Sequence, residues 1–268
     1  MAITSIDKLA AALGSGQHRF LIYPTGTTVA GGFANLARLV IGAQGQATVP
    51  TVRGSGGQVH NQGDAGYVPI TAPQGGNTLY IGRAAITMAL AGGIAWYDRL
   101  YSASGFDGTL TTAQTITAPP SYSRNANGVG AQIFIESYTA VGASASNVTV
   151  QYTNSAGVSG RNTVAETIIA SMPAHRLQPL RLQAGDLGVQ SIQSVTLSAT
   201  TSAAGNFGVV VAVPVFEIAA PVINIPVVYD YAQLSLPALT TGACLMPVHM
   251  GTTTTTGNII GSLDIVEG

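Results

Sequence analysis

Residues 147–153 read NVTVQYT, and this stretch decides the fold class. Val148, Val150 and Tyr152 occupy every second position, with polar residues between them. Successive side chains of a β-strand point to opposite faces, so this alternation predicts a strand with one buried and one solvated face. Half-buried strands of this kind are typical of antiparallel sheets. The stretch therefore favours an antiparallel β-protein.

Short strands separated by turns rich in glycine and serine extend outward from this stretch in both directions. The eight predicted strands are 94–101, 109–117, 128–138, 146–153, 162–171, 176–183, 189–200 and 206–216. Eight short strands at this spacing fit a two-sheet antiparallel β-sandwich. A jelly roll is preferred to another Greek-key sandwich, although the sequence does not separate the two.

One irregularity is expected inside the seventh strand. Val195 and Leu197 alternate with polar residues, but Ile192 is out of phase with them. A β-bulge inserts one extra residue into a strand and resets its alternation. We therefore predict a bulge near Gln193-Ser194.

The regions flanking the sandwich lead to three predicted segments. Residues 1–93 contain a helix, an extended arm and the first strand of a hairpin, 94–216 form the sandwich core, and 217–268 form a C-terminal extension with a β-hairpin. The helix is predicted over 4–13, with a capping box between Thr4 and Asp7. Its expected apolar face comprises Ile6, Leu9, Ala10 and Leu13.

The remaining flanking sequence supports weaker predictions. A strand is predicted over 17–23, and residues 33–40 repeat helical spacing. Residues 42–77 are almost without periodicity, which predicts an arm that becomes ordered on a neighbouring molecule, with disorder as the alternative. Segments 79–90 and 94–101 resemble two strands of a hairpin. Further predicted strands are 227–236, 244–250 and 258–266, with the threonine run 252–256 as a hairpin tip.

Composition is informative about function. Only 8% of the residues are charged, against about 25% in a typical soluble domain, whereas 46% are apolar. Lys8 is the single lysine. Soluble monomers are kept apart largely by surface charge, so this composition predicts a chain that covers surface by assembling. The alternative is a secreted protein with a surface rich in threonine and serine.

Charge, cysteine content and hydropathy exclude several classes of partner. The formal net charge of −1 provides no electrostatic footprint for nucleic acid or for anionic lipid. Cys244 is the single cysteine, which rules out an intrachain disulfide and favours a small buried hydrophobe. Asp7 and Lys8 interrupt any signal peptide, and neither 84–97 nor 208–228 qualifies as a membrane span. We expect no nucleic-acid or membrane partner, and a protein that is soluble, or at least intracellular when made.

No motif of a known cofactor or metal site is present. The four histidines, His18, His60, His175 and His249, have no zinc-ligand spacing. His60 lies beside Asn61 and near Asp64, where we interpret it as a solvated loop residue. Neither a nucleophile elbow nor a Walker loop occurs. The sequence predicts no catalytic, cofactor-binding or metal-binding residue.

The carboxylates are single and scattered. A glycosidase pair assembled from separate strands stays possible, because such pairs depend on spacing in three dimensions. Sugar grooves are usually lined by aromatic residues, however, and the one tryptophan, Trp96, falls in a predicted core strand. Structural roles are expected for the remaining charges. Asp98-Arg99 would cap a turn or pair at a subunit contact, Asp186 would bond its local turn, and Arg161 would reach a neighbouring carboxylate.

Several phrases of the sequence resemble a family of virion structural proteins of tailed bacteriophages. The phrases that carry the resemblance are Tyr97–Leu100, Thr111–Thr115, Tyr152–Arg161 and Gln183–Ser194, together with Ile6–Ala12 and Gly261–Ile265. The resemblance spans nearly the whole chain. It implies a structural protein of the virion, and it implies no catalytic residue.

Composition and resemblance together lead to three hypotheses. In the first, the chain is a capsid decoration or cement protein that binds the outer surface of the head. Its partners would be the major capsid protein and further copies of itself, with a trimer favoured, and it would be made in the host bacterial cytoplasm. In the second, it is a tail, collar or baseplate component that contacts virion proteins or host glycans. In the third, which the missing aromatic groove disfavours, it is a sandwich-fold glycan hydrolase.

Overall fold

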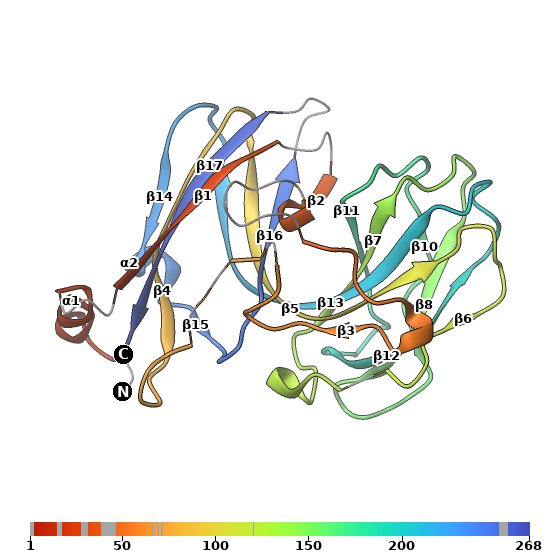
Figure 1. Cartoon of the computed structure of the whole chain (residues 1–268), viewed down its shortest axis with the longest axis horizontal. Coiled ribbons are helices and arrows are strands. Elements are labelled where there is room, and N and C mark those ends of the chain that lie inside the picture. The colour runs from red at the N-terminus through yellow and green to blue at the C-terminus, as the bar shows by residue number, and fades with distance from the viewer. Residues whose placement is uncertain are drawn as a thin grey trace. The chain divides into compact units, whose positions relative to one another are not determined.

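The computed structural model describes residues 3–14, 18–27, 32–38, 47–65, 67–68, 70, 72–119, 121–251 and 257–268 (Figure 1). The chain divides into two compact units, and neither is one continuous segment. Unit 1 comprises Met1–Ala47, Gln62–Tyr97 and Val215–Gly268, and unit 2 comprises Thr48–Asn61 and Asp98–Pro214. The predicted sandwich core, 94–216, thus corresponds closely to the larger segment of unit 2.

Unit 2 contains the eight predicted strands. Its elements are η3 (Arg53–Ser55), β3 (Gln58–Val59), the end of β5 (Gly92–Phe106), β6 (Gln114–Thr115), η4 (Ser123–Asn125), β7 (Gln132–Thr139), β8 (Asn147–Asn154), β9 (Arg161–Asn162), β10 (Glu166–Thr167), β11 (Arg176–Leu180), β12 (Val189–Leu197) and the start of β13 (Asn206–Ala220). Two of the predicted strands are shorter than expected. The segment 109–117 contributes only β6, and 162–171 contributes the two short strands β9 and β10.

The strand order of unit 2 is that of a jelly roll. One sheet pairs β11 with β7, β7 with β13, and β13 with β5. The other runs β10, β8, β12, β6, with β9 also paired to β8. Apart from β8, β9 and β10, which share one sheet, strands that are neighbours in sequence alternate between the two sheets, as in a jelly roll. The prediction of an all-β, jelly-roll-like sandwich with a short N-terminal helix is confirmed.

The predicted alternation is also confirmed. Val148, Val150 and Tyr152 are fully buried in the core between the two sheets, as are Ile133 and Ile135. The register between β12 and β8 shifts between Ile192 and Ser194, at the position where the phase change predicted a bulge. Extra residues at such a point let β12 keep its apolar side chains on the core face.

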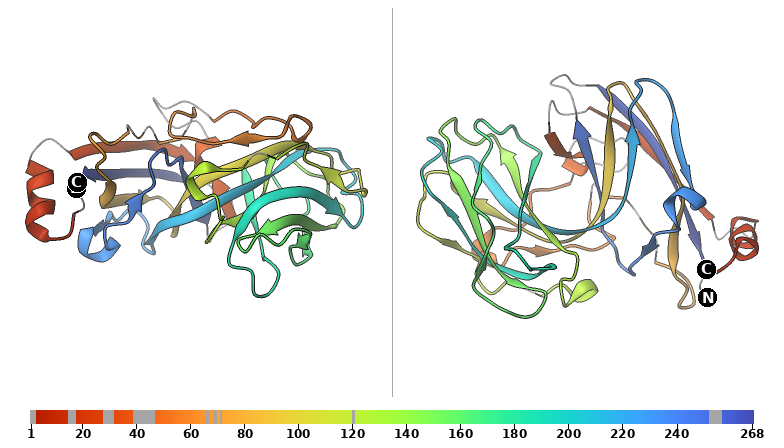
Figure 2. Two further views of the ribbon diagram at one scale, coloured as in Figure 1. Left: turned by 90° about the horizontal axis from the view of Figure 1, so that it is seen from below. Right: turned by 180° about the vertical axis from the view of Figure 1, so that it is seen from behind.

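Unit 1 is a second two-layer β-structure, which the sequence did not predict. Its elements are α1 (Ile6–Gly14), β1 (His18–Thr27), β2 (Gly32–Asn35), η1 (Leu36–Arg38), β4 (Leu79–Met88), the start of β5, the end of β13, β14 (Val227–Asp230), α2 (Tyr231–Leu234), β15 (Ala238–Leu239), β16 (Leu245–Gly251) and β17 (Asn258–Glu267). One sheet has the order β1, β17, β4, β14, with β15 also paired to β4, while β2 pairs with β16 in the other. Figure 2 shows the red strand β1 running beside the blue strand β17.

The core of unit 1 lies between these layers. Ile81, Ile86 and Leu263 from one sheet pack in one buried cluster with Trp96 and Ile218 from the other. The Trp96 ring stacks on Phe216, with the ring centroids 5.6 Å apart. Trp96 is therefore a core residue, as predicted.

The segments that were predicted as arms pack against their own chain. Within the predicted arm 42–77, the described residues include a 3-10 turn and β3, and Tyr67, Val68 and Ile70 are buried. The C-terminal extension contributes β14, β16 and β17 to unit 1. Pairing between the beginning and the end of the chain explains this, since β17 lies between β1 and β4.

The predicted N-terminal helix is present, but of the four residues expected on its buried face only Leu9 is buried. Helix α1 begins at Ile6, and the Ser5 hydroxyl accepts the Lys8 backbone N–H, so Ser5 provides the cap in place of Thr4. Leu9 and Ala12 are buried with Ile3 and Val266, whereas Ile6 is exposed. Leu13 and Ala10, also expected on the buried face, are exposed too. The side that packs is set by contact with β17 and not by the widest apolar stripe.

Two predicted hairpins are also wrong. Strands β4 and β5 belong to different sheets, so Ala91-Gly92-Gly93 carries the chain from one layer to the other. The same holds for β16 and β17, and the threonine run 252–256 lies outside the described residues. Close packing explains the glycines, because a Cβ on Gly92 or Gly93 would collide with a backbone carbonyl of β16 or β13.

Two smaller predictions need correction. Residues 33–38 form β2 and a 3-10 turn in place of a helix, and Val40 lies outside the described residues. The predicted strand 227–236 ends at Asp230, whose side chain caps the short helix α2. No helix among the described residues has the length and apolar character needed to cross a membrane.

Candidate interaction surface

Three loops meet at one end of the unit 2 sandwich. They are 155–160, between β8 and β9; 183–188, between β11 and β12; and 128–130, which precedes β7. Backbone hydrogen bonds join them: Gly130 N–H donates to the Leu187 carbonyl at 2.8 Å, and Ser155 N–H donates to the Gly188 carbonyl at 3.0 Å. The three loops therefore form one connected surface, which we call the loop end.

Asp186 holds the loop end together. Its side chain, only 3% exposed, accepts hydrogen bonds from the Tyr152 hydroxyl at 2.5 Å, from Asn154 Nδ2 at 2.7 Å and from Arg161 Nε at 3.0 Å. The Tyr152 hydroxyl in turn accepts the Gln183 backbone N–H at 2.9 Å. Two strands and two loops are thus tied to a single carboxylate.

The electrostatics of this network favour the ionised form of Asp186. Burial alone would raise the pKa of the Asp186 carboxyl, but the hydrogen bonds from Arg161, Tyr152 and Asn154 outweigh it and lower the pKa to about 2. Burial, with the hydrogen bond to Asp186, raises the pKa of Tyr152 to about 12. At neutral pH the network therefore contains an ionised carboxylate and a neutral phenol.

The hairpin 155–160 is fixed in the same way. Asn154 Oδ1 accepts the backbone N–H groups of Ala156 and Val158, at 3.1 and 2.9 Å. Bonds from a side chain to the backbone two and four residues further on define the path of a turn locally. The tip of this hairpin is therefore held to the carboxylate network through Asn154, which donates to Asp186 and accepts from the tip.

These fixed loops present apolar side chains to solvent. Leu187 is 76% exposed, Val129 59% and Val158 51%. Large apolar groups that are exposed on well-defined loops indicate an interaction surface, because the backbone geometry keeps each one in contact with water. The loop end is thus an ordered surface with three protruding aliphatic side chains.

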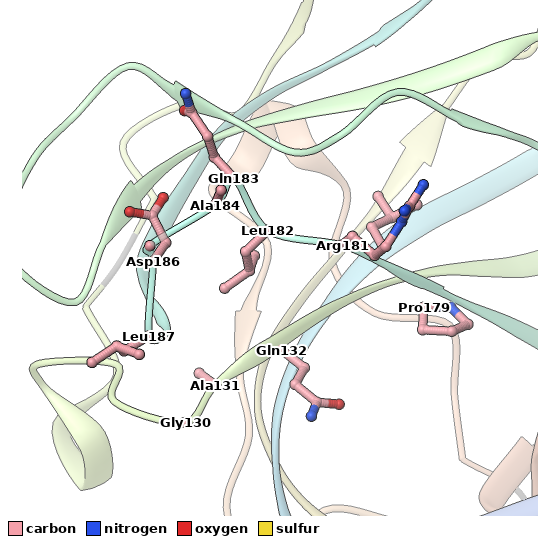
Figure 3. Close-up of a pocket in the computed structure, with 12 residues that line it drawn as sticks. Gly130, Ala131, Gln132, Pro179, Arg181, Leu182, Gln183, Ala184, Asp186 and Leu187 are labelled. Carbon is pink, nitrogen blue, oxygen red and sulfur yellow. The ribbon is translucent and has the colours of Figure 1, made fainter.

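A recess of about 620 Å³ lies beside Leu187 (Figure 3). It is lined by Gly130, Ala131, Gln132, Pro179, Leu180, Arg181, Leu182, Gln183, Ala184, Gly185, Asp186 and Leu187. Leu182 points from its loop toward the start of β7, where Ala131 lies, while Gln183 points away from it. The recess is open and its lining is largely aliphatic, which suits contact with another protein surface.

The carboxylates of unit 2 are neutralised within the unit. Four of the five form ion pairs with arginine: Asp98 with Arg124, Glu136 with Arg99, Glu166 with Arg181, and Asp186 with Arg161. The fifth, Asp107, accepts hydrogen bonds from the backbone and hydroxyl of Thr109, which lower its pKa. The loop end therefore faces solvent with little uncompensated charge.

The structure places most of the residues that the sequence singled out. Arg161 reaches a neighbouring carboxylate, as predicted, and that carboxylate is Asp186. The side chain of Asp186 bonds across to β8 and β9 in place of the predicted bond to its local turn. Asp98 and Arg99 pair with partners inside unit 2, which is neither the turn cap nor the subunit contact that was expected.

The prediction for His60 is wrong. We expected a solvated loop residue, but His60 is buried and its Nε2 lies 2.5 Å from the Ser102 hydroxyl. The pairing of β3 with β5 carries His60 inward, and the sequence around it has no periodicity that reveals this. Cys244 is buried, as predicted. That the chain holds no metal, cofactor or catalytic residue stays a prediction.

Sequence reasoning missed the residues that protrude from the loop end. Leu187 and Val158 lie in the glycine-rich phrases Gln183–Ser194 and Tyr152–Arg161, which were noted only for their resemblance. A signal was available, since an aliphatic residue between turn glycines belongs to no periodic strand. Such a residue has no core face to occupy and is left at the surface.

No protein-family model and no curated protein matches the chain. Among solved structures, the Gt strain of infectious bursal disease virus gives a TM-score of 0.18 at 12% identity, over 93% of this chain and 81% of that one. The VP2 subviral particle of the same virus gives 0.19 at 11% identity, over 93% and 80%. TM-scores this low do not indicate a shared fold, so these likenesses carry no functional argument.

Proposed function

We propose that this chain is a structural protein of a bacteriophage virion, and specifically a decoration or cement protein of the head. In this role it binds the outer surface of an icosahedral shell, and its partners are the major capsid protein and further copies of itself, with a trimer favoured. It acts by burying shell surface and by bridging neighbouring capsomers. It performs no catalysis.

One observation carries the proposal. Leu187, the most exposed large apolar residue of unit 2, protrudes from a loop that Asp186 and two backbone hydrogen bonds hold in place. Ordered apolar anchors lose little conformational entropy on binding, and such anchors are where interface energy concentrates. The low charge of the chain and the resemblance of its sequence to phage structural proteins agree with this role.

Internal neutralisation of charge also supports an assembly role over an enzymatic one. Catalytic carboxylates need their pKa matched to proton transfer near neutral pH. The carboxylates of unit 2 are instead paired with arginines or hydrogen-bonded by Thr109, and the pKa values of Asp186 and Asp107 are lowered. These groups stabilise the fold and leave its surface with little uncompensated charge.

Copy number tests the role. The amount of this chain per purified virion is measured against the major capsid protein by quantitative gel or mass spectrometry. A ratio near one, or a simple fraction of it, is expected for a lattice-binding protein. A handful of copies per particle would assign the chain to the tail, collar or baseplate, and its absence from particles would overturn both structural roles.

The binding surface is tested separately with purified protein added to heads that lack it. Replacement of a central apolar anchor typically costs about 2 kcal/mol or more, so Leu187→Asp is expected to weaken binding by about 30-fold. Leu110→Asp is the matched control, because Leu110 is also exposed and lies in a loop that bonds to 201–204 at the opposite end of the sandwich. Equal binding by both variants and the unaltered chain would exclude the loop end as the contact.

A further inference from the structure

Arg176, the first residue of β11, is buried, and its guanidinium has no partner among the described residues. The residue is only 6% exposed, and its Nε is enclosed. Its backbone N–H donates to the Ser137 hydroxyl at 3.2 Å, but within the described part of the chain its guanidinium makes no hydrogen bond or ion pair. The two terminal nitrogens keep the residual access to solvent.

A counter-charge from the same unit is not available to Arg176. The five carboxylates of unit 2 are committed elsewhere, four to other arginines and Asp107 to Thr109. The guanidinium of Arg53 differs from that of Arg176, because it donates to the carbonyls of Gly105 and Thr115. A guanidinium stays protonated even when burial lowers its pKa, so Arg176 retains its charge. A buried charge without a partner is strongly unfavourable.

The position of Arg176 separates it from the loop end. It follows the loop 171–175, and Ser171 N–H donates to the Gly142 carbonyl at 3.0 Å, next to the loop that contains Thr201. These loops form the end of the sandwich opposite Leu187. The register of β11 on β7 places Arg176 on the same strand face as Gln178 and Leu180, at the margin of the core.

We infer that Arg176 is the centre of an oxyanion-binding site whose acceptor comes from outside this chain. The planar guanidinium presents two terminal NH₂ groups that match the two oxygens of a carboxylate or of a phosphate. Two sources provide this chemistry: a free inorganic oxyanion, or a carboxylate of a neighbouring copy of this chain. The inference does not depend on the role in a virion.

Thermal unfolding in two buffers tests the site and the first source. The melting temperature is measured in inorganic phosphate and in chloride at equal ionic strength for the unaltered chain, Arg176→Met, Arg176→Lys and Arg181→Gln. Phosphate at ten times its Kd is expected to raise the melting temperature by about 3 °C in the unaltered chain. Arg181→Gln, which removes an exposed arginine just beyond the same strand, should respond equally.

Two variants of Arg176 separate the effect of its charge from that of its paired hydrogen-bond donors. Arg176→Met should lose the response to phosphate, and in chloride it should melt at or above the temperature of the unaltered chain, since it removes an uncompensated charge. Arg176→Lys keeps the charge without the paired donors and should respond weakly. A lower melting temperature of Arg176→Met in chloride would instead reveal a partner inside the chain and overturn the inference.

The molecular mass in solution tests the second source, a carboxylate of a neighbouring copy. A carboxylate from a neighbouring copy predicts association that rises with concentration in the unaltered chain and in Arg181→Gln, and that Arg176→Met abolishes. Light scattering during size-exclusion chromatography measures this directly. If the unaltered chain shows neither a response to phosphate nor association that depends on Arg176, the site does not exist.

Discussion

The backbones of Gly128 and Gly188 pass so close to each other that neither position has room for a side chain. A Cβ on Gly188 would overlap the Gly128 carbonyl, and a Cβ on Gly128 would overlap the Val189 carbonyl. The Val189 N–H donates to the Gly128 carbonyl at 2.8 Å across this approach. The loop that carries Leu187 is therefore positioned by backbone packing as well as by Asp186.

Gly188→Ala should consequently destabilise unit 2. Overpacking of this kind costs typically 1–3 kcal/mol, so we expect a loss of about that size in the free energy of unfolding. Gly54→Ala is the matched control, because a Cβ at Gly54 meets no atom within 4 Å. The control should be neutral or slightly stabilising. Denaturant unfolding of both variants measures the difference, and equal stabilities would show that the close approach relaxes without cost.

Asp186→Ala should be more destabilising than the location of Asp186 in a loop suggests. It leaves Tyr152, Asn154 and Arg161 without their common acceptor, which we expect to cost about 2–3 kcal/mol. Glu166→Gln removes the other arginine-paired carboxylate near the recess, but Arg181 is mostly exposed, so the loss of stability should be small. A stability of Asp186→Ala equal to that of Glu166→Gln, measured by urea unfolding, would contradict the central role of the Asp186 carboxylate.

The same carboxylate predicts an acid-sensitive stability. The pKa of Asp186 is about 2 in the folded chain, below its ordinary value of 3.8. A lowered folded pKa means that the stabilisation is complete above about pH 4 and is lost as the pH falls toward 2. The free energy of unfolding of the unaltered chain should therefore fall faster between pH 4 and 2 than that of Asp186→Asn. Parallel pH profiles for the two proteins would exclude this assignment.

The buried pair of Arg99 and Glu136 gives a prediction about charge in the core. Both side chains are fully buried, and Arg99 Nη2 lies 2.7 Å from Glu136 Oε2. Glu136→Gln leaves a buried guanidinium without its counter-ion, which should cost about 3–5 kcal/mol. The double variant Arg99→Met with Glu136→Leu should recover most of that loss, because apolar side chains of similar volume carry no desolvation penalty. A double-mutant cycle in denaturant tests this, and additive losses would contradict it.

Much of unit 2 could be predicted from the sequence, because its information is local. Alternation in 147–153 identified a core strand, and the phase change at Ile192 located a bulge that the register of β12 contains. Turn glycines marked the strand ends. Each of these signals lies within a few residues of the feature that it describes.

Unit 1 could not be predicted in this way, because its order depends on pairings between distant residues. Nothing near Leu263 indicates that it lies opposite Leu21 on one side and Ala84 on the other. The hairpin expected at Gly92-Gly93 failed for the same reason, since local turn chemistry does not reveal which sheet the next strand joins. At the loop end, Arg161 was expected to find a carboxylate, but its identity depended on a contact across 25 residues.

The position of β17 in the centre of its sheet has a consequence for synthesis. Unit 2 contains all its strands once residue 214 has left the ribosome, so it can close while translation continues. The sheet of unit 1 cannot form until residues 258–267 arrive to lie between β1 and β4. Until then β1 and the edge of β4 that β17 covers are unpaired and can pair with other nascent chains, although β14 and β15 can already pair with the rest of β4. Aggregation is therefore most favoured after residue 214 has left the ribosome and before residues 258–267 have done so. Chaperone binding should be concentrated in this interval.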